Sequence, residues 1–235
     1  MAVPTPHRDG KYEIRNTRYK IRFEVFGFLA LVMNSMDLKS KLTLVVLGRS
    51  GSGKGTQAQN ILQYLRKDGV YHIETGRFMR ELLEHDNATL AILRKHMGDG
   101  KLMPAWFPIF TWLRELIEKG HADKHLVYDG APRRLIEAEL LDEVMSWHER
   151  PLPFCVSIDV SEEEAVRRLR LRSRADDDDE AIRNRMAYFP RDVMPVIEYY
   201  ENRDRLLRVD GNRTPDNVWR AIDEGLRDRL GKKWR

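Results

Sequence analysis

A glycine-rich segment constrains this 235-residue chain more than any other feature of its sequence. Gly48–Thr56 reads GRSGSGKGT and follows the aliphatic run Leu42–Leu47, which predicts a strand buried on both faces. The next segment, Gln57–Lys67, has apolar residues at helical spacing. Glycines let a backbone curl until several N–H groups meet one anion, and the following helix adds its positive N-terminal end. With Lys54 as a mobile cation, the segment predicts a loop that binds phosphate groups.

Further short runs with the composition of buried strands alternate with helical stretches along the chain. These candidate strands are Tyr71–Ile73, His125–Tyr128, Phe154–Ile158 and Leu206–Val209. Strands that alternate with helices predict a parallel sheet with right-handed crossovers. We therefore expect an α/β protein with the P-loop NTPase fold, in which helices flank a five-stranded parallel sheet.

Composition excludes several classes of protein. The single cysteine, Cys155, rules out an internal disulfide framework and a multi-cysteine zinc site, which fits a reducing, cytoplasmic setting. No apolar run reaches the roughly 18 residues of a membrane span, so we expect no membrane partner. The histidines lack metal-ligand spacing. The formal charge of +4 does not distinguish nucleic acid from small phosphorylated ligands as a partner.

Residues 1–38 differ from the rest of the chain. They contain prolines, a basic stretch and the short apolar patch Val25–Met33. The simpler interpretation is a non-functional extension ahead of the true start at a later methionine. The other is an amphipathic element that docks onto a partner or a membrane surface.

One residue in the phosphate-binding loop narrows the protein class. Most P-loops have Ser or Thr after the lysine, whereas this chain has Gly55. The resulting GKGTQ sequence of Gly53–Gln57 resembles the adenylate kinase family. Further segments match this family in the same order: Thr75–Arg80 (TGRFMR), Gly100–Pro104 (GKLMP), Asp129–Arg133 (DGAPR), the arginine-rich 168–177 followed by Arg185, and Val209–Gly211 (VDG).

This resemblance implies a nucleoside monophosphate kinase domain over residues 39–235. A helical insertion near 75–104 would bind the acceptor, and a very short lid near 172–180, with no room for zinc, would cover the site. The implied reaction is reversible phosphoryl transfer from Mg-ATP to AMP, giving two ADP, in a monomer that binds no nucleic acid.

The resemblance also assigns roles to individual residues. ATP binding is assigned to Gly51, Ser52, Gly53, Lys54, Gly55, Thr56, Arg168, Arg172 and Arg213. AMP binding is assigned to Thr75, Arg80, Lys101, Leu102, Met103, Gly130, Ala131, Pro132, Arg133, Glu137, Arg174 and Arg185. Catalysis is assigned to Lys54, Arg133, Arg172, Arg174 and Arg185. At the end of a strand, Asp129 is expected to orient Mg²⁺ through water.

The residue types agree with this chemistry. Phosphoryl transfer brings two anionic phosphate groups together in line, and the spreading negative charge must be neutralised. Guanidinium groups suit this task because they stay charged and bind phosphate oxygens bidentately. Arg168 and Arg172 are spaced to share one helix face. Outside the matched positions, Arg167, Arg170 and Arg183 are expected to be solvated surface charges.

The acceptor base stays open because of Glu137. The family has glutamine there, which offers adenine one donor and one acceptor, whereas an ionised glutamate only accepts. Guanine presents two donors, so a carboxylate suits GMP, while Thr75 matches the members that prefer AMP. We expect AMP as the acceptor. The alternatives are another nucleoside monophosphate, GMP first, or a nucleotide-binding protein that has lost its activity.

Overall fold

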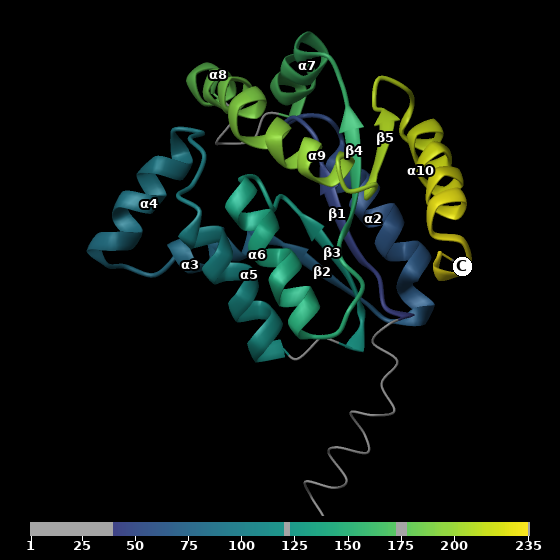
Figure 1. Ribbon diagram of the computed structural model, residues 1–235. Coiled ribbons are helices and arrows are strands. Elements are labelled where there is room, and N and C mark those ends of the chain that lie inside the picture. The colour runs from purple at the N-terminus through teal and green to yellow at the C-terminus, as the bar shows by residue number, and fades with distance from the viewer. Residues whose placement is uncertain (1–39, 120–122, 173–177, 235) are drawn as a thin grey trace, which may run out of the picture. The chain divides into compact units, whose positions relative to one another are not determined.

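The computed structural model describes residues 40–119, 123–172 and 178–234, which belong to one compact unit, Leu38–Arg235. The extension 1–38 and most of the expected lid, residues 173–177 including Arg174, lie outside the described residues. Five strands form one sheet in the order β2-β3-β1-β4-β5, and each pair of neighbours is parallel (Figure 1). Their bounds are β1 Thr43–Leu47, β2 Val70–Glu74, β3 His125–Asp129, β4 Phe154–Asp159 and β5 Leu206–Asp210. The predicted five-stranded parallel sheet is confirmed.

Helices cover both faces of this sheet (Figure 1). They are α2 Lys54–Leu65, α3 Thr75–Leu83, α4 Ala88–Gly98, α5 Trp106–Lys119, α6 Leu135–Trp147, α7 Glu162–Arg172, α8 Asp179–Tyr188, α9 Met194–Glu201 and α10 Pro215–Leu230, with a π-helical turn η4 at Phe189–Val193 and short 3₁₀ turns η2 Arg66–Asp68 and η5 Gly231–Lys233. Side chains of β1 alternate between the two faces, because successive residues of a strand point to opposite sides. Val45 and Leu47 join the core under α5, α6 and α9, whereas Leu44 and Val46 join the core under α2 and α10.

The segment between β2 and β3 has an apolar core of its own. Met79 and Leu83 of α3, Leu93 of α4, and Met103 and Phe107 near the start of α5 form this separate cluster. Phe78 of α3 and Trp112 of α5 belong to the main core, so this small cluster adjoins the sheet's own packing.

The topology brings the candidate segments to one edge of the sheet. The central strand β1 pairs with β3 on one side and β4 on the other, and Val46 lies opposite Asp129. Ligands of open α/β sheets bind outside the carboxyl ends of the strands. The matched segments that begin at Gly48, Thr75 and Asp129 all lie at these ends.

Two expectations from composition can be compared with the fold. Cys155 is fully buried in β4, and burial raises the pKa of its thiol, so it is a core residue as predicted. Across residues 40–119, 123–172 and 178–234, no helix is long and apolar enough to span a membrane.

Candidate active site

The glycine-rich loop connects β1 to α2 and packs tightly against its neighbours. Gly48 has φ +141° and Gly51 has φ +85°, values that side-chain-bearing residues rarely adopt. A Cβ atom on Gly48 would lie 2.4 Å from the backbone oxygen of Ile158, and one on Gly51 would lie 2.5 Å from that of Ala165. The loop is therefore held between the end of β4 and helix α7, and only glycine fits at these two positions.

Lys54 occupies the first position of α2 and folds back onto the loop. Its Nζ donates hydrogen bonds to the carbonyl oxygens of Gly48, at 2.9 Å, and Arg49, at 2.6 Å. Burial lowers the pKa of Lys54 to about 7, Asp129 opposes this shift, and Arg133 and Arg172 add to it. A bound phosphate would stabilise the protonated amine, because an anion nearby favours the charged form. Both hydrogen-bond acceptors of Lys54 are therefore backbone oxygens of the loop itself.

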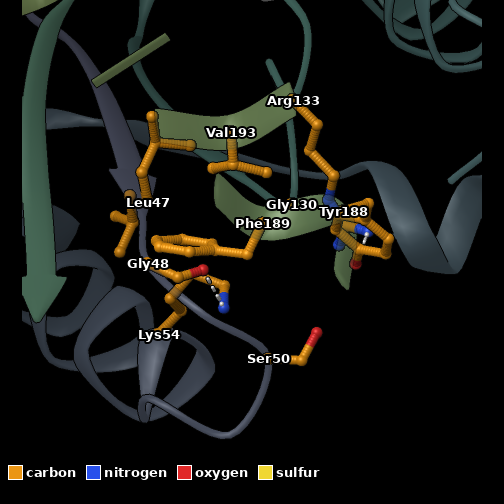
Figure 2. A pocket seen from close by; sticks show the side chains of 10 residues that line it. Leu47, Gly48, Ser50, Lys54, Gly130, Arg133, Tyr188, Phe189 and Val193 are labelled. Carbon is orange, nitrogen blue, oxygen red and sulfur yellow. Dashed lines mark hydrogen bonds between the residues drawn. The ribbon is translucent and has the colours of Figure 1, made fainter. Parts of the chain in front are cut away.

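Side chains from two other segments meet this loop (Figure 2). Arg133 follows β3, and its guanidinium donates to the Tyr188 hydroxyl at 3.2 Å. Phe189 and Val193 of η4 complete the hollow beside the loop. Its volume is only about 10 Å³, room for about one water molecule.

The sequence did not identify the two aromatic side chains that line this hollow, Tyr188 and Phe189. Tyr188 and Phe189 read as ordinary core residues of a helix, and only their position at the π-helical turn brings them to the loop. It also missed Arg49, whose guanidinium lies 4.4 Å from the centroid of the Phe189 ring. No motif in the sequence marks these residues.

Asp129 is the residue that the sequence analysis expects to hold Mg²⁺. It ends β3 beside the first turn of α2, and a Cβ atom on Gly55 would be 3.7 Å from its Oδ2. In the described ranges, no group of three or more His, Cys, Asp or Glu residues could hold a metal ion. A single carboxylate fits Mg²⁺, which keeps several waters and takes its other ligands from substrate phosphates.

Two of the residues expected to bind the acceptor, Thr75 and Arg80, lie on α3. Thr75 begins α3 and is fully buried, and its hydroxyl has no hydrogen-bond partner within the part of the chain that the structure describes. On the same helix, Arg80 pairs with Glu74 at 3.2 Å. This single contact uses only part of the guanidinium, which has five N–H donors.

The loop after α4 is tied to the rest of the insertion. Lys101 pairs with Asp99 at 2.8 Å, Leu102 O lies 3.0 Å from His96 Nε2, and Met103 is buried in the small apolar cluster. Gly130, Ala131 and Pro132 form the turn that carries Arg133 away from β3. The structure thus places the GKLMP segment in the loop between α4 and α5, and the DGAPR segment at the end of β3 and in the loop that follows it.

Glu137 is buried in the first turn of α6, with 1% of its surface exposed. Its Oε2 accepts a hydrogen bond from the backbone N–H of Arg133 at 2.9 Å, and its Oε1 has no hydrogen-bond partner in residues 40–119, 123–172 and 178–234. Burial raises the pKa of Glu137 to about 7 although Arg133 and Arg134 lower it.

The donor-side residues lie on α7 and in the loop after β5. Arg168 and Arg172 share one face of α7, as their spacing predicts. Arg168 binds Glu164 at 2.6 Å and the carbonyl oxygen of Gly211 at 2.9 Å, which joins α7 to the VDG segment. Arg213, in the same loop, pairs with Asp210 at 3.1 Å. The two predicted donor segments are therefore neighbours in space.

Three further arginines from the sequence analysis can be located. Arg185 is 9% exposed on α8, whereas Arg167 and Arg170 are exposed and pair with Glu164 and Asp179. Within the loop itself, Ser52 is buried, and its hydroxyl has no hydrogen-bond partner among the described residues.

Comparison with known proteins identifies the family. The family profile described as adenylate kinase matches residues 46–205. The adenylate kinase of Thermus thermophilus is 35% identical over 187 residues, which span 78% of this chain and 96% of that protein. UMP-CMP kinase 1 of Oryza sativa is 36% identical, over 77% of this chain and 73% of its own length. Adenylate kinase 1 of Nostoc is 30% identical, over 78% and 97%. This chain, a nucleoside monophosphate kinase by its relatives, belongs to the adenylate kinase family.

Proposed function

We propose that this kinase transfers a phosphoryl group reversibly from Mg-ATP to AMP, giving two ADP. The observation that carries the proposal is that Arg133, from the loop after β3, lines the same hollow as Lys54 of the P-loop. Two cations from separate segments meet there, as the transfer between two phosphate groups requires.

Each charged residue then has a task in this proposal. Lys54 exchanges its carbonyl partners for phosphate oxygens and follows the charge that moves during transfer. Arg133 holds the acceptor phosphate, and Arg172 and Arg185, together with Arg174, clamp the transferring group. Mg²⁺ bound with ATP neutralises part of the phosphate charge, and Asp129 would hold it through water. No protein nucleophile is needed, because the attacking oxygen belongs to the acceptor.

The insertion 75–104 binds the acceptor and the segment 172–180 covers the site in this proposal. Support comes from a contact between the insertion and α8. Asn184 donates a hydrogen bond to the carbonyl oxygen of Asp99 at 2.8 Å, and a Cβ atom on Gly100 would lie 2.6 Å from Ala181 Cα. This contact holds the insertion against α8, the arrangement expected when the site excludes water.

AMP is the proposed acceptor for two reasons. Thr75 is present, and this chain matches nearly the full length of relatives named adenylate kinase. Glu137 favours GMP as the second candidate when it is ionised. The Oryza relative named UMP-CMP kinase makes pyrimidine monophosphates the third.

A coupled assay with ATP and each of AMP, GMP, CMP and UMP tests the proposal. We expect the highest kcat/KM with AMP, and a higher value with any other acceptor would refute the assignment. A Lys54→Met variant shows whether turnover arises at the P-loop. If this variant keeps the native rate, the activity belongs to another site or another protein.

A further inference from the structure

Arg49 is a second cation of the phosphate-binding loop, and the sequence analysis assigns it no role. It stands between Gly48 and Ser50, which both line the hollow beside the loop. Its own carbonyl oxygen accepts the hydrogen bond from Lys54 Nζ at 2.6 Å. Arg49 therefore belongs to the part of the loop that holds Lys54, and the task of its side chain is open.

The guanidinium of Arg49 contacts two other elements. Its central carbon lies 4.4 Å from the centroid of the Phe189 ring, within the roughly 6 Å range of a cation–π contact. Its Nη1 lies 3.8 Å from Glu162 Oε2 on α7, which is too long for a hydrogen bond. The Glu162 side chain is also 54% exposed, and an exposed ion pair of this kind contributes little. The aromatic ring is therefore the partner that fixes the guanidinium.

Phe189 is the residue through which this contact reaches the active site. It begins the π-helical turn η4, a rare geometry that is frequent at functional sites. The ring is 6% exposed and lines the hollow together with Val193 and Lys54 (Figure 2). The hollow has a volume of about 10 Å³, room for about one water molecule. Phe189 and Val193 thus form an apolar side that offers water no hydrogen bond.

Exclusion of water matters to a kinase because water competes with the acceptor for the phosphoryl group. In that side reaction the oxygen of water bonds to the γ-phosphorus and the bond to the β–γ bridging oxygen breaks. ADP leaves with the electron pair of that bond, and the attacking water gives up a proton. The products are ADP and inorganic phosphate, and the acceptor stays unphosphorylated.

We propose that Arg49 is a positioning residue that holds the Phe189 ring beside the P-loop and thereby directs the phosphoryl group to the acceptor rather than to water. The contact joins two segments that are distant in the sequence, so each fixes the place of the other. This inference builds on the kinase activity of the family and does not depend on which base the acceptor carries.

The experiment measures a partition ratio, the inorganic phosphate released per acceptor phosphorylated, with Mg-ATP and the best acceptor. Arg49→Met keeps an unbranched side chain and removes the charge, so we expect the ratio to rise about three- to tenfold, as loss of a cation–π contact permits. Arg49→Lys should restore most of the native ratio, because an ammonium also binds a ring face. Lys54→Met protein, purified in the same way, measures hydrolysis by contaminants.

A double-mutant cycle shows whether Arg49 acts through the ring. If it does, Phe189→Leu raises the ratio, and adding Arg49→Met to it causes no further rise. Additive effects, or an unchanged ratio with a raised KM for ATP in Arg49→Met, overturn the inference because they indicate a direct phosphate contact. An equal rise in Arg49→Lys and Arg49→Met also overturns it.

The comparison of Arg49→Met with Arg49→Lys stands alone if Phe189→Leu fails to fold, since Arg49 lies in a loop with 23% of its side chain exposed. Unfolding midpoints close to that of the native protein show that a changed ratio does not come from lost stability. If AMP is not the best acceptor, the proposed function fails and the ratio with the better acceptor still tests Arg49. If AMP is the best acceptor and the ratio is the same in all variants, only this inference fails.

Discussion

Replacing Gly51 by alanine tests whether the P-loop is held in shape by helix α7. The new Cβ atom would lie 2.5 Å from the backbone oxygen of Ala165 and 3.1 Å from Leu169 Cγ. The carbonyl belongs to the helix backbone, so it cannot rotate away as a side chain would. Gly53 provides a matched control, because it has a similar φ, +93° against +85°, but a Cβ atom there meets no described residue within 4 Å.

Both substitutions place an alanine in a left-handed backbone conformation, but only Gly51→Ala also creates a close contact with α7. A left-handed backbone conformation costs an alanine about 1–2 kcal/mol at either position. The contact with α7 adds about 1–3 kcal/mol at Gly51 only, as overpacking does in a protein interior. We therefore expect Gly51→Ala to lower the free energy of unfolding by about 2–5 kcal/mol, and Gly53→Ala by about 1–2 kcal/mol.

Urea denaturation of both variants, followed by circular dichroism, measures this difference. Because α7 also carries Arg168 and Arg172, Gly51→Ala should raise the KM for ATP as well. The reasoning is refuted if Gly53→Ala is as destabilising as Gly51→Ala, or if Gly51→Ala unfolds at the native urea concentration.

Three other predictions concern the active site, the contact between insertion and α8, and a buried histidine. Lys54→Met should lower kcat about 100- to 1,000-fold while the unfolding midpoint changes little, and an unchanged kcat would contradict the assigned role. Asn184→Ala removes the 2.8 Å hydrogen bond to Asp99 O, which contributes about 0.5–1.5 kcal/mol. This variant should raise the KM for AMP about two- to tenfold. An unchanged KM would show that this bond does not hold the insertion against α8 when AMP binds. His125 accepts a hydrogen bond from the Leu42 N–H at 3.1 Å, and burial lowers its pKa from 6.5 to about 4. Below about pH 6.5 the unfolded chain therefore binds more protons than the folded protein, and the free energy of unfolding falls as the pH approaches 4. The loss should be about 2 kcal/mol and should be absent in His125→Asn, as measured by urea unfolding at about pH 7 and pH 4.5; equal losses in both proteins would contradict it.

The sheet was predictable because its strands are short apolar runs buried on both faces. Each predicted strand agrees with the observed one to within one residue at either end. The predicted start of α2 at Gln57 was wrong, since the helix begins at Lys54. Its first turn is a polar, glycine-containing segment without apolar periodicity, so the pattern did not reveal it. The strand order β2-β3-β1-β4-β5 depends on how the crossovers pack, which no local pattern encodes.

The candidate site was predictable where a motif marks it and not where packing alone creates it. Lys54 and Arg133 were expected from their segments, and the fold brings both to one hollow. Phe189 and Tyr188 line the same hollow, but an aromatic residue in a helix has the same sequence signature whether it faces the core or a ligand. The unpartnered oxygen of Glu137 depends on neighbours that are distant in the sequence, such as the partners of Arg133 and Arg134.

The resting partners of the cations are a further property that residue types cannot supply. Lys54 binds backbone carbonyl oxygens, Arg80 binds Glu74, and Arg168 binds Glu164. Each partner neutralises or solvates the charge of its own cation. A guanidinium has five N–H donors and an ammonium has three, so each of these side chains keeps donors for a phosphate oxygen beside its present partner. The partners therefore orient the cations without using up their capacity to bind an anion.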